Sequence, residues 1–192
     1  MTAELERRSA RVETEGSTIH GLAIVFGSLS EDLGGFREVI EASAVDRTLS
    51  ENIDVRALVD HEPGKIIGRL SARTLTLEKR SDGLAVRITP PNTTVGRDIL
   101  ESVKRGDVTG MSFTFGVVRP GGDRFEQRAD GLVRYVSDMR IREVSLVTFP
   151  AYEATDATVA QRSLQAFREQ QAGPGRSVAC LQRALAIGHA RR

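Results

Sequence analysis

The chain has 192 residues, with 27 lysines and arginines against 26 aspartates and glutamates. This near balance excludes a general electrostatic attraction to nucleic acid or to a membrane surface, and the length suits one domain with a short appendage. The single cysteine, Cys180, excludes an intramolecular disulfide framework and is typical of a reducing compartment. No apolar run is long enough to span a bilayer and the N-terminus is polar, so we expect neither a membrane span nor a secretion signal.

The first half of the chain is dominated by short patterns in which apolar and polar residues alternate. Residues 1–16 are charged and weakly periodic, which predicts a flexible lead-in or an edge strand before a domain over residues 17–152. Alternation predicts strands over residues 19–26, 36–40, 55–59, 66–70, 73–79 and 84–88. Residues 42–49 suit a short helix, and Asp82-Gly83 between two alternating runs predicts a hairpin turn.

The clearest helix is predicted over residues 93–105. Thr93 or Thr94 can cap its N-terminus, Gly106 ends it, and apolar residues recur at helical spacing along one face. We expect this helix to pack on a sheet just before the next strand. Further strands are predicted over residues 110–118, 132–136 and 140–147, with a loop at 120–123 and a turn at Asp130-Gly131.

The stretch Gly110–Gly116 displays a serine between bulky apolar residues. Its period-two alternation places Ser112 and Thr114 on one face of a strand and the apolar side chains on the other face. Most serines in such a position are ordinary strand residues. A catalytic nucleophile would also need a base nearby.

Candidate bases are few, because the chain has only three histidines. His189 lies near the end of the chain, and His20 fits a half-exposed strand position. His61 follows the strand pattern 55–59 and is expected to open a surface loop over residues 61–65, where functional side chains are often found. A polar loop histidine without a catalytic role is the ordinary alternative.

Glu143 is an acidic residue within a predicted strand. Simple alternation groups it with Ile141, Ser145 and Val147, so we expect a half-buried carboxylate that needs a partner. Two partners remain open at this point, namely one of the many arginines in an ion pair, or His61. Asp60 and Glu62 flank His61, but they are poor candidates to orient it, since adjacent strand residues point to opposite faces.

Four blocks of the sequence, taken in order, resemble the prohead (capsid maturation) serine proteases of tailed bacteriophages. The resemblance begins near Gly21 and runs to Tyr152, about two thirds of the chain. The blocks are Asp60-His61 followed by Ile67-Gly68-Arg69, then Thr109-Gly110-Met111-Ser112-Phe113, then Arg142-Glu143-Val144-Ser145-Leu146-Val147, and finally Pro150-Ala151-Tyr152.

The resemblance implies an α+β fold with a β-barrel-like antiparallel core surrounded by helices, distantly similar to herpesvirus assembly proteases. It also implies serine proteolysis, for which we assign Ser112 as the nucleophile, His61 as the base and Glu143 as the group that orients the base. Backbone amides near Gly110, or the side chain of Arg140 or Arg142, are candidate oxyanion donors.

The biology implied by the resemblance is cleavage inside the immature phage capsid, within the host bacterial cytoplasm. The expected substrates are scaffold or the scaffolding segment of the major capsid protein, together with the protease itself. No metal, other cofactor, membrane or specific nucleic acid is expected, and a homo-oligomer remains open. Residues 153–192 form a basic tail, with six arginines and one acid between positions 161 and 192, which self-cleavage could remove.

Two other functions remain open from the sequence. The first is a catalytically inactive capsid scaffold or structural assembly protein, in which Ser112 and His61 only pack. The second is a hydrolase of another class, such as a metal-dependent one. The second is weak, because the histidines are scattered and no His-x-x-x-His or paired-cysteine spacing occurs.

Overall fold

The computed structural model describes residues 12–148, 164–165 and 167–169. The chain divides into two compact units, Met1–Tyr152 and Glu153–Arg192. In the second unit the described residues are helical, and Gln165 Nε2 donates a hydrogen bond of 3.1 Å to Glu169 Oε1. The predictions made for Cys180, for His189 and for the rest of the basic tail lie outside the described residues.

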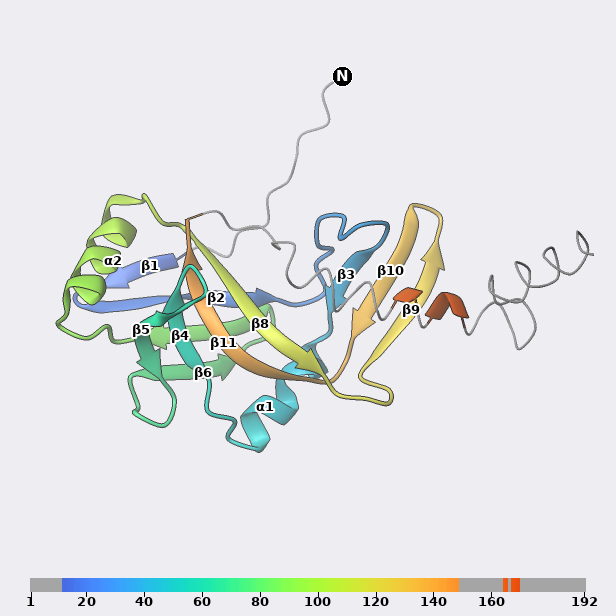
Figure 1. The fold of residues 1–192 in the computed structure, drawn as a ribbon, viewed down its shortest axis with the longest axis horizontal. Helices are drawn as coiled ribbons and strands as arrows, with labels where there is room; N and C mark the ends of the chain where they lie inside the picture. Colours follow the sequence, from blue (N-terminus) through green and yellow to red (C-terminus); the bar gives the residue numbers. More distant parts are fainter. Residues whose placement is uncertain (1–11, 149–163, 166, 170–192) are drawn as a thin grey trace, which may run out of the picture. The chain divides into compact units, whose positions relative to one another are not determined.

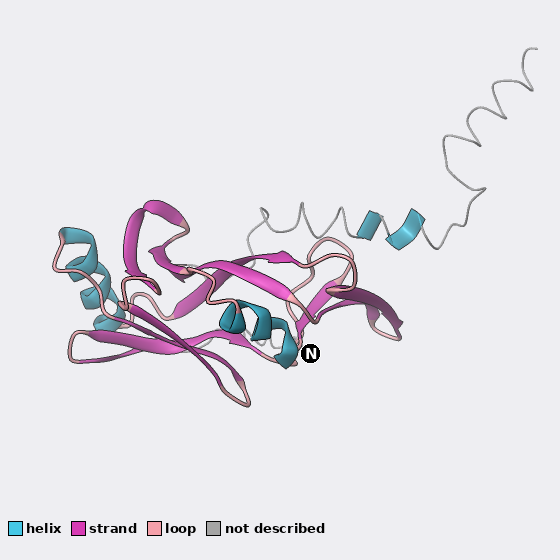
Figure 2. Cartoon of the chain, turned by 90° about the horizontal axis from the view of Figure 1, so that it is seen from below, coloured by secondary structure: helices cyan, strands magenta, loops and turns pink. Residues whose placement is uncertain are grey.

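Strands make up most of the first unit (Figures 1 and 2). They are β1 (Val12–Glu15), β2 (Thr18–Val25), β3 (Arg37–Ile40), β4 (Arg56–Val59), β5 (Glu62–Arg69), β6 (Leu75–Lys79), β7 (Gly83–Ile88), β8 (Gly110–Val117), β9 (Asp123–Arg128), β10 (Gly131–Val136) and β11 (Met139–Val147). The helical elements are a 3₁₀ turn (Ala42–Val45), α1 (Asp46–Ser50) and α2 (Thr94–Arg105).

The strands form three sheets, with the orders β1-β2-β7-β6, β3-β10-β9 and β5-β4-β11-β8. Most neighbours are antiparallel, but β4 with β11 and β3 with β10 are parallel pairs. In Figure 1, β8 and β11 run side by side as a long curved pair. This pair and β4 carry the residues that form the candidate site described below.

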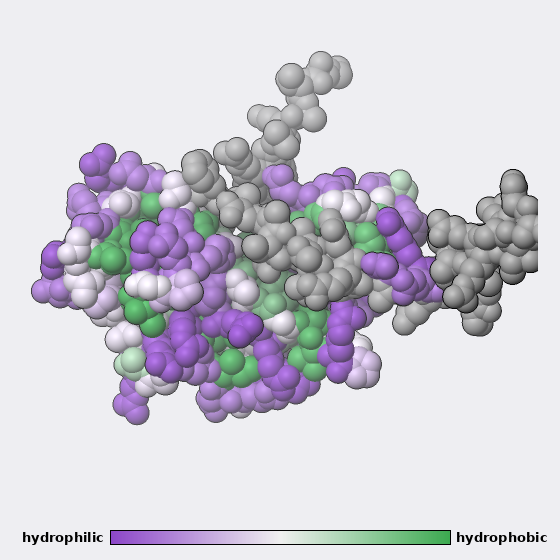
Figure 3. All heavy atoms as spheres, viewed as in Figure 1, coloured by the Kyte–Doolittle hydropathy of each residue, from purple (hydrophilic) through white to green (hydrophobic). Residues whose placement is uncertain are grey.

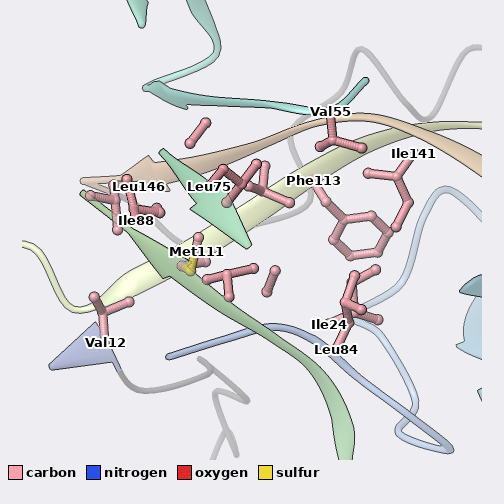
Figure 4. Close-up of a cluster of buried hydrophobic side chains, with 14 of the residues drawn as sticks. Val12, Ile24, Val55, Leu75, Leu84, Ile88, Met111, Phe113, Ile141 and Leu146 are labelled. Atoms are coloured by element: carbon pink, nitrogen blue, oxygen red, sulfur yellow. The ribbon is translucent and has the colours of Figure 1, made fainter. Parts of the chain in front are cut away.

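The main core lies between the β1-β2-β7-β6 and β5-β4-β11-β8 sheets. Figure 4 shows Met111 and Phe113 of β8 directed at side chains of the facing sheet, among them Ile24 and Ile88. These positions are at most 7 % exposed. Because strand side chains alternate between faces, burying the Met111–Phe113 face leaves Ser112 and Thr114 on the opposite face of β8.

The predicted helix before β8 is present as α2, and its ends follow the expected chemistry. Thr93 Oγ1 accepts a hydrogen bond of 3.2 Å from Gly96 N, which satisfies one of the free amides at the helix start. Gly106 ends the helix in the left-handed conformation, with a φ of 80°. Ile99 and Val103 of α2 are buried in the main core.

The α+β class is confirmed, but the barrel-like closure is not found among the described residues. Closing a sheet requires hydrogen bonds between its two outermost strands, and each of the three sheets is open in the described part of the chain. Alternation predicts which face of a strand is buried, and it does not predict which strands pair. Helical cover is also smaller than expected, because the described residues of this unit hold one α-helix of 12 residues, one of 5 and a single 3₁₀ turn.

Val12–Glu15 forms an edge strand on β2, which is one of the two alternatives predicted for residues 1–16. Other local features differ from the prediction, and the differences have simple causes. Strand β9 was not predicted, because its sequence is mostly polar and its side chains are mainly exposed. The loop expected over residues 61–65 is also wrong, since Glu62–Lys65 already belong to β5.

The face of the molecule drawn in Figure 3 is mostly polar, with apolar residues in scattered patches. Ile66 is the one large apolar side chain classed as exposed in the described part of the chain, at 42 %. Within that same part, no helix is long and apolar enough to cross a membrane.

Candidate active site

The strand pair β8–β11 aligns the predicted nucleophile with the predicted acid. Ser112 lies directly opposite Ser145, and Thr114 lies directly opposite Glu143. Directly opposed strand residues have their Cβ atoms about 5 Å apart and share one face of the sheet. Four polar side chains therefore occupy the face of these strands that points away from the core.

A β-bulge determines on which face Glu143 lies. Ile141 is paired with Phe115, whereas Glu143 is paired with Thr114, so Arg142 is an extra residue in β11. Without this extra residue, Glu143 would share a face with buried Ile141, as simple alternation predicted. The bulge turns the carboxylate to the face that carries Ser112, and bulges of this kind are common beside active sites.

His61 is delivered by a two-residue turn between β4 and β5. Val59 pairs with Glu62, and the two intervening residues, Asp60 and His61, have φ angles of 49° and 56°. Positive φ at both central residues is the signature of a type I′ hairpin turn. The turn is held in place because Asp60 Oδ1 accepts a hydrogen bond of 3.0 Å from Thr148 N, just after β11.

The turn places the His61 ring against Glu143. The Nδ1 atom of His61 lies 2.6 Å from Glu143 Oε1. Glu143 Oε1 also accepts a hydrogen bond of 2.5 Å from Thr114 Oγ1, and Glu143 Oε2 accepts one of 2.6 Å from Ser145 Oγ. With the carboxylate ionised, this contact requires His61 Nδ1 to donate, and in the neutral ring Nε2 is then the acceptor.

The site is sheltered yet reachable from solvent. The side chain of Glu143 is 12 % exposed and that of His61 is 35 % exposed. Ser145 is fully buried, whereas Ser112 and Thr114 are half-buried. Within the described residues, Glu143 forms no ion pair with an arginine, which was the other partner considered for it.

Ser112 is brought to the same face as His61 and Glu143, but no hydrogen bond joins Ser112 to His61. Its hydroxyl makes no side-chain hydrogen bond within the described residues, in contrast to the hydroxyls of Thr114 and Ser145. Catalytic hydrogen bonds are often long in proteins without substrate and tighten when substrate binds. Ser112 thus differs from Thr114 and Ser145, whose hydroxyls are bound to Glu143.

The two arginines considered as oxyanion donors differ in their surroundings. Arg140 is held by Glu51, with an Nη2–Oε2 distance of 3.1 Å. Arg142, the extra residue of the bulge, is exposed and makes no ion pair within the described residues. Of these two arginines, only Arg142 makes no ion pair within the described residues. Gly110 is buried and paired with Val147 at the end of β11.

The charged side chains of Glu62 and Lys65, which follow the turn in β5, contact each other. Lys65 Nζ lies 2.8 Å from Glu62 Oε1, and this contact raises the pKa of Lys65 above its ordinary value, with a smaller contribution from Asp60. In the described part of the chain, no group of three or more His, Cys, Asp or Glu side chains is placed to hold a metal ion.

His20 and the neighbouring acidic and basic groups of the β1-β2-β7-β6 sheet are not part of the candidate site. His20 Nε2 lies 3.6 Å from Glu13 Oε2, and both residues line a surface hollow of about 460 Å³. None of the three predicted catalytic residues lines this hollow.

Thr114 and Ser145 are site residues that the sequence analysis did not assign. Both lie two positions from a predicted catalytic residue, so the same alternation places them on the same face. Their hydroxyls gave no separate signal, because threonine and serine are ordinary residues on a strand. Only the contact with Glu143 distinguishes them.

The comparisons agree with the family suggested by the sequence blocks. Residues 3–170 match the model of the caudovirus prohead serine protease family, which is well over half of the chain. No curated protein matches the chain. The matched segment includes the β8–β11 pair and the turn that delivers His61, and the chain belongs to the caudovirus prohead serine protease family.

Proposed function

We propose that this protein is a serine endopeptidase of phage capsid maturation that uses Ser112, His61 and Glu143. Membership of the prohead serine protease family supplies the reaction class and the setting. The observation that carries the residue assignment is the 2.6 Å contact between His61 Nδ1 and Glu143 Oε1, on the sheet face that also displays Ser112.

The proposed reaction follows from the roles of the three side chains. The Ser112 hydroxyl attacks the carbonyl carbon of the scissile peptide while His61 Nε2 takes its proton. The imidazolium then protonates the leaving amine, and an acyl-enzyme ester remains on Ser112. Water, activated by His61, hydrolyses this ester and regenerates the serine. Glu143 holds the imidazole in the required tautomer and stabilises its positive charge.

Stabilisation of the tetrahedral oxyanion needs donors beside Ser112. We assign part of this role to Arg142, because it is exposed, adjacent to Glu143 in the bulge and not engaged in an ion pair within the described residues. Arg140 is excluded from this assignment, since Glu51 already holds its guanidinium.

The substrates we propose are scaffold or the scaffolding segment of the major capsid protein, and the protease itself. The proposed site of action is the interior of the procapsid. Confinement there would prevent the enzyme from destroying unassembled building blocks. Removal of the basic tail, residues 153–192, by self-cleavage is part of the proposal. An architecture related to herpesvirus assembly proteases is also part of it.

A fluorophosphonate probe tests the proposal directly, because it forms a covalent bond with an activated serine. We expect labelling of the wild-type protein at Ser112, located by peptide mapping, and no labelling of Ser112→Ala. Ser71→Ala, a substitution in an exposed turn, is the matched control and should label like the wild type. Co-expression with the capsid protein should give shortened products only with active variants.

Two outcomes would overturn the proposal. Modification of a residue other than Ser112 would move the nucleophile elsewhere. A folded wild-type protein that is neither labelled nor able to shorten its capsid protein would favour the inactive scaffold.

A further inference from the structure

The carboxylate of Glu143 is held by two hydroxyl groups in addition to His61. Thr114 Oγ1 donates to Oε1, and Ser145 Oγ donates to Oε2. We propose that Thr114 and Ser145 are positioning residues of the proteolytic site, which fix Glu143 so that it can orient His61. This inference rests on the proposed function, because it assigns roles around the same three side chains.

Ser145 connects the acid and the base. Its Oγ donates to Glu143 Oε2 at 2.6 Å and accepts a hydrogen bond of 3.2 Å from the backbone amide of His61. One fully buried hydroxyl thus ties the carboxylate to the turn that delivers the imidazole. A shift of the turn relative to β11 would break this link. Ser145 therefore fixes the position of the turn after β4 relative to β11 at the site.

Thr114 acts on the oxygen that faces the imidazole. Its hydroxyl and His61 Nδ1 both contact Glu143 Oε1. Strand β8 carries Thr114 two residues after Ser112, so the same strand that presents the nucleophile also holds the acid. This arrangement links the position of Glu143 to the position of Ser112.

Without these hydroxyls, Glu143 would have competing partners. Arg56 lies beside Glu143 in the parallel strand β4, and Arg142 precedes it in the bulge. A carboxylate in an ion pair with a guanidinium is strongly favoured when the geometry allows it. Arg56 is instead directed to Asp54, with an Nη2–Oδ2 distance of 3.8 Å. Each carboxylate oxygen of Glu143 instead accepts a hydrogen bond from a hydroxyl, and neither arginine forms an ion pair with Glu143 within the described residues.

The experiment compares variants that remove a hydroxyl with variants that keep it. Thr114→Val is nearly the same shape but lacks the donor, and Thr114→Ser keeps the donor. Ser145→Ala removes the hydrogen bonds of Ser145 Oγ to Glu143 and to the His61 amide. Ser145→Thr keeps the hydroxyl at this buried position. Thr76→Val, at an exposed position of β6 in another sheet, is the matched control. Each protein is labelled with increasing concentrations of the fluorophosphonate probe, and its melting temperature is measured.

We expect Thr114→Val and Ser145→Ala to lower the limiting labelling rate by about 10- to 100-fold, the effect of losing a hydrogen bond to a charged group. The probe concentration for half-maximal rate should change little, because both hydroxyls are bound to Glu143. Thr114→Ser should recover most of the rate, and Thr76→Val should not alter it. A purely structural role would lower the melting temperature and leave the limiting rate per folded molecule unchanged.

A second readout does not depend on catalysis. The ¹⁵N and proton resonances of the His61 ring report which nitrogen carries the proton and how strongly it is bound. We expect the chemical shifts of the His61 ring to change in Thr114→Val and Ser145→Ala and to remain unchanged in Thr76→Val and Ser112→Ala. If Ser112 is labelled but Thr114→Val behaves as the wild type in both readouts, the positioning roles are wrong and the proposed function stands.

If the wild-type protein is not labelled at Ser112, the proposed function fails, and the ring resonances alone decide the positioning roles. Unchanged resonances in Thr114→Val would then overturn them as well. Thr114 is half-buried and its valine variant keeps its shape, so this test remains available should Ser145→Ala fail to fold.

Discussion

Replacement of Glu143 by glutamine distinguishes a catalytic role of this carboxylate from a purely structural role. The substitution keeps the shape of the side chain but removes its charge, and the amide can present a donor to His61 Nδ1. His61 would then turn its acceptor nitrogen to the amide, so that Nε2 carries the proton and cannot take one from Ser112. The corresponding change in chymotrypsin-type proteases lowers kcat by about 10⁴-fold, and we expect a loss approaching that size.

The expected loss of stability is much smaller. Three donors reach the carboxylate in the folded protein, at 2.6, 2.5 and 2.6 Å. Hydrogen bonds to a charged group contribute about 1.5–3 kcal/mol, against about 0.5–1.5 kcal/mol for neutral ones, and the amide retains part of each contact. We therefore expect the free energy of unfolding to fall by about 1–3 kcal/mol, or about 3 °C in Tm for each kcal/mol in a domain of this size.

The assay measures the fluorophosphonate labelling rate and the Tm on the same preparation of Glu143→Gln. Glu78→Gln, an exposed glutamate on β6, serves as the matched control and should leave the labelling rate unaltered. A labelling rate near that of the wild type, together with a lowered Tm, would refute the catalytic role. The orienting group would then have to be another acid or a bound water.

Two further predictions concern stability. Gly83→Ala should destabilise the protein by about 1–3 kcal/mol, because a Cβ there would lie 2.1 Å from the carbonyl oxygen of Ile24. Gly116→Ala adds a Cβ in open space and should change the free energy of unfolding by less than about 0.5 kcal/mol, and urea unfolding of both variants checks this. The Arg47 hydrogen bonds lower the pKa of Asp138 below its ordinary value. This pair therefore stabilises the fold above about pH 4 and loses its effect as the pH falls through the lowered value, so Asp138→Asn should reduce Tm at pH 7 and differ less from the wild type near pH 2.

The parts of the fold that depend on local chemistry could be predicted from the sequence. The helix α2 begins after a threonine cap and ends at Gly106, and both signals lie within the segment itself. The hairpin between β6 and β7 follows from Asp82-Gly83 between alternating runs. The face of β8 on which Ser112 lies follows from alternation alone, because no bulge interrupts the segment around it.

The parts that depend on pairing between distant segments could not be predicted. The turn at Asp60-His61 was expected as a longer loop, because Pro63 and Gly64 are typical of loops, yet they lie within β5. Nothing in the sequence near Glu143 shows that β4 runs parallel to β11 beside it. The contacts of Thr114 and Ser145 with Glu143 and with the His61 turn depend on the pairing of β11 with β8 and with β4, so they could be found only from the structure.

The bulge at Arg142 connects these two kinds of information. Simple alternation grouped Glu143 with Ile141 and so placed the acid on a face shared with the core. The register shift between Ile141 and Glu143 moves the carboxylate to the face of Ser112 and leaves Ile141 buried. Because of this single extra residue, β11 places Ile141 in the core and, two positions later, Glu143 on the opposite face at the candidate site. The extra residue, Arg142, is exposed and is the cation that we propose for the oxyanion, so the bulge accounts for the position of the acid and carries the proposed donor next to it in the sequence.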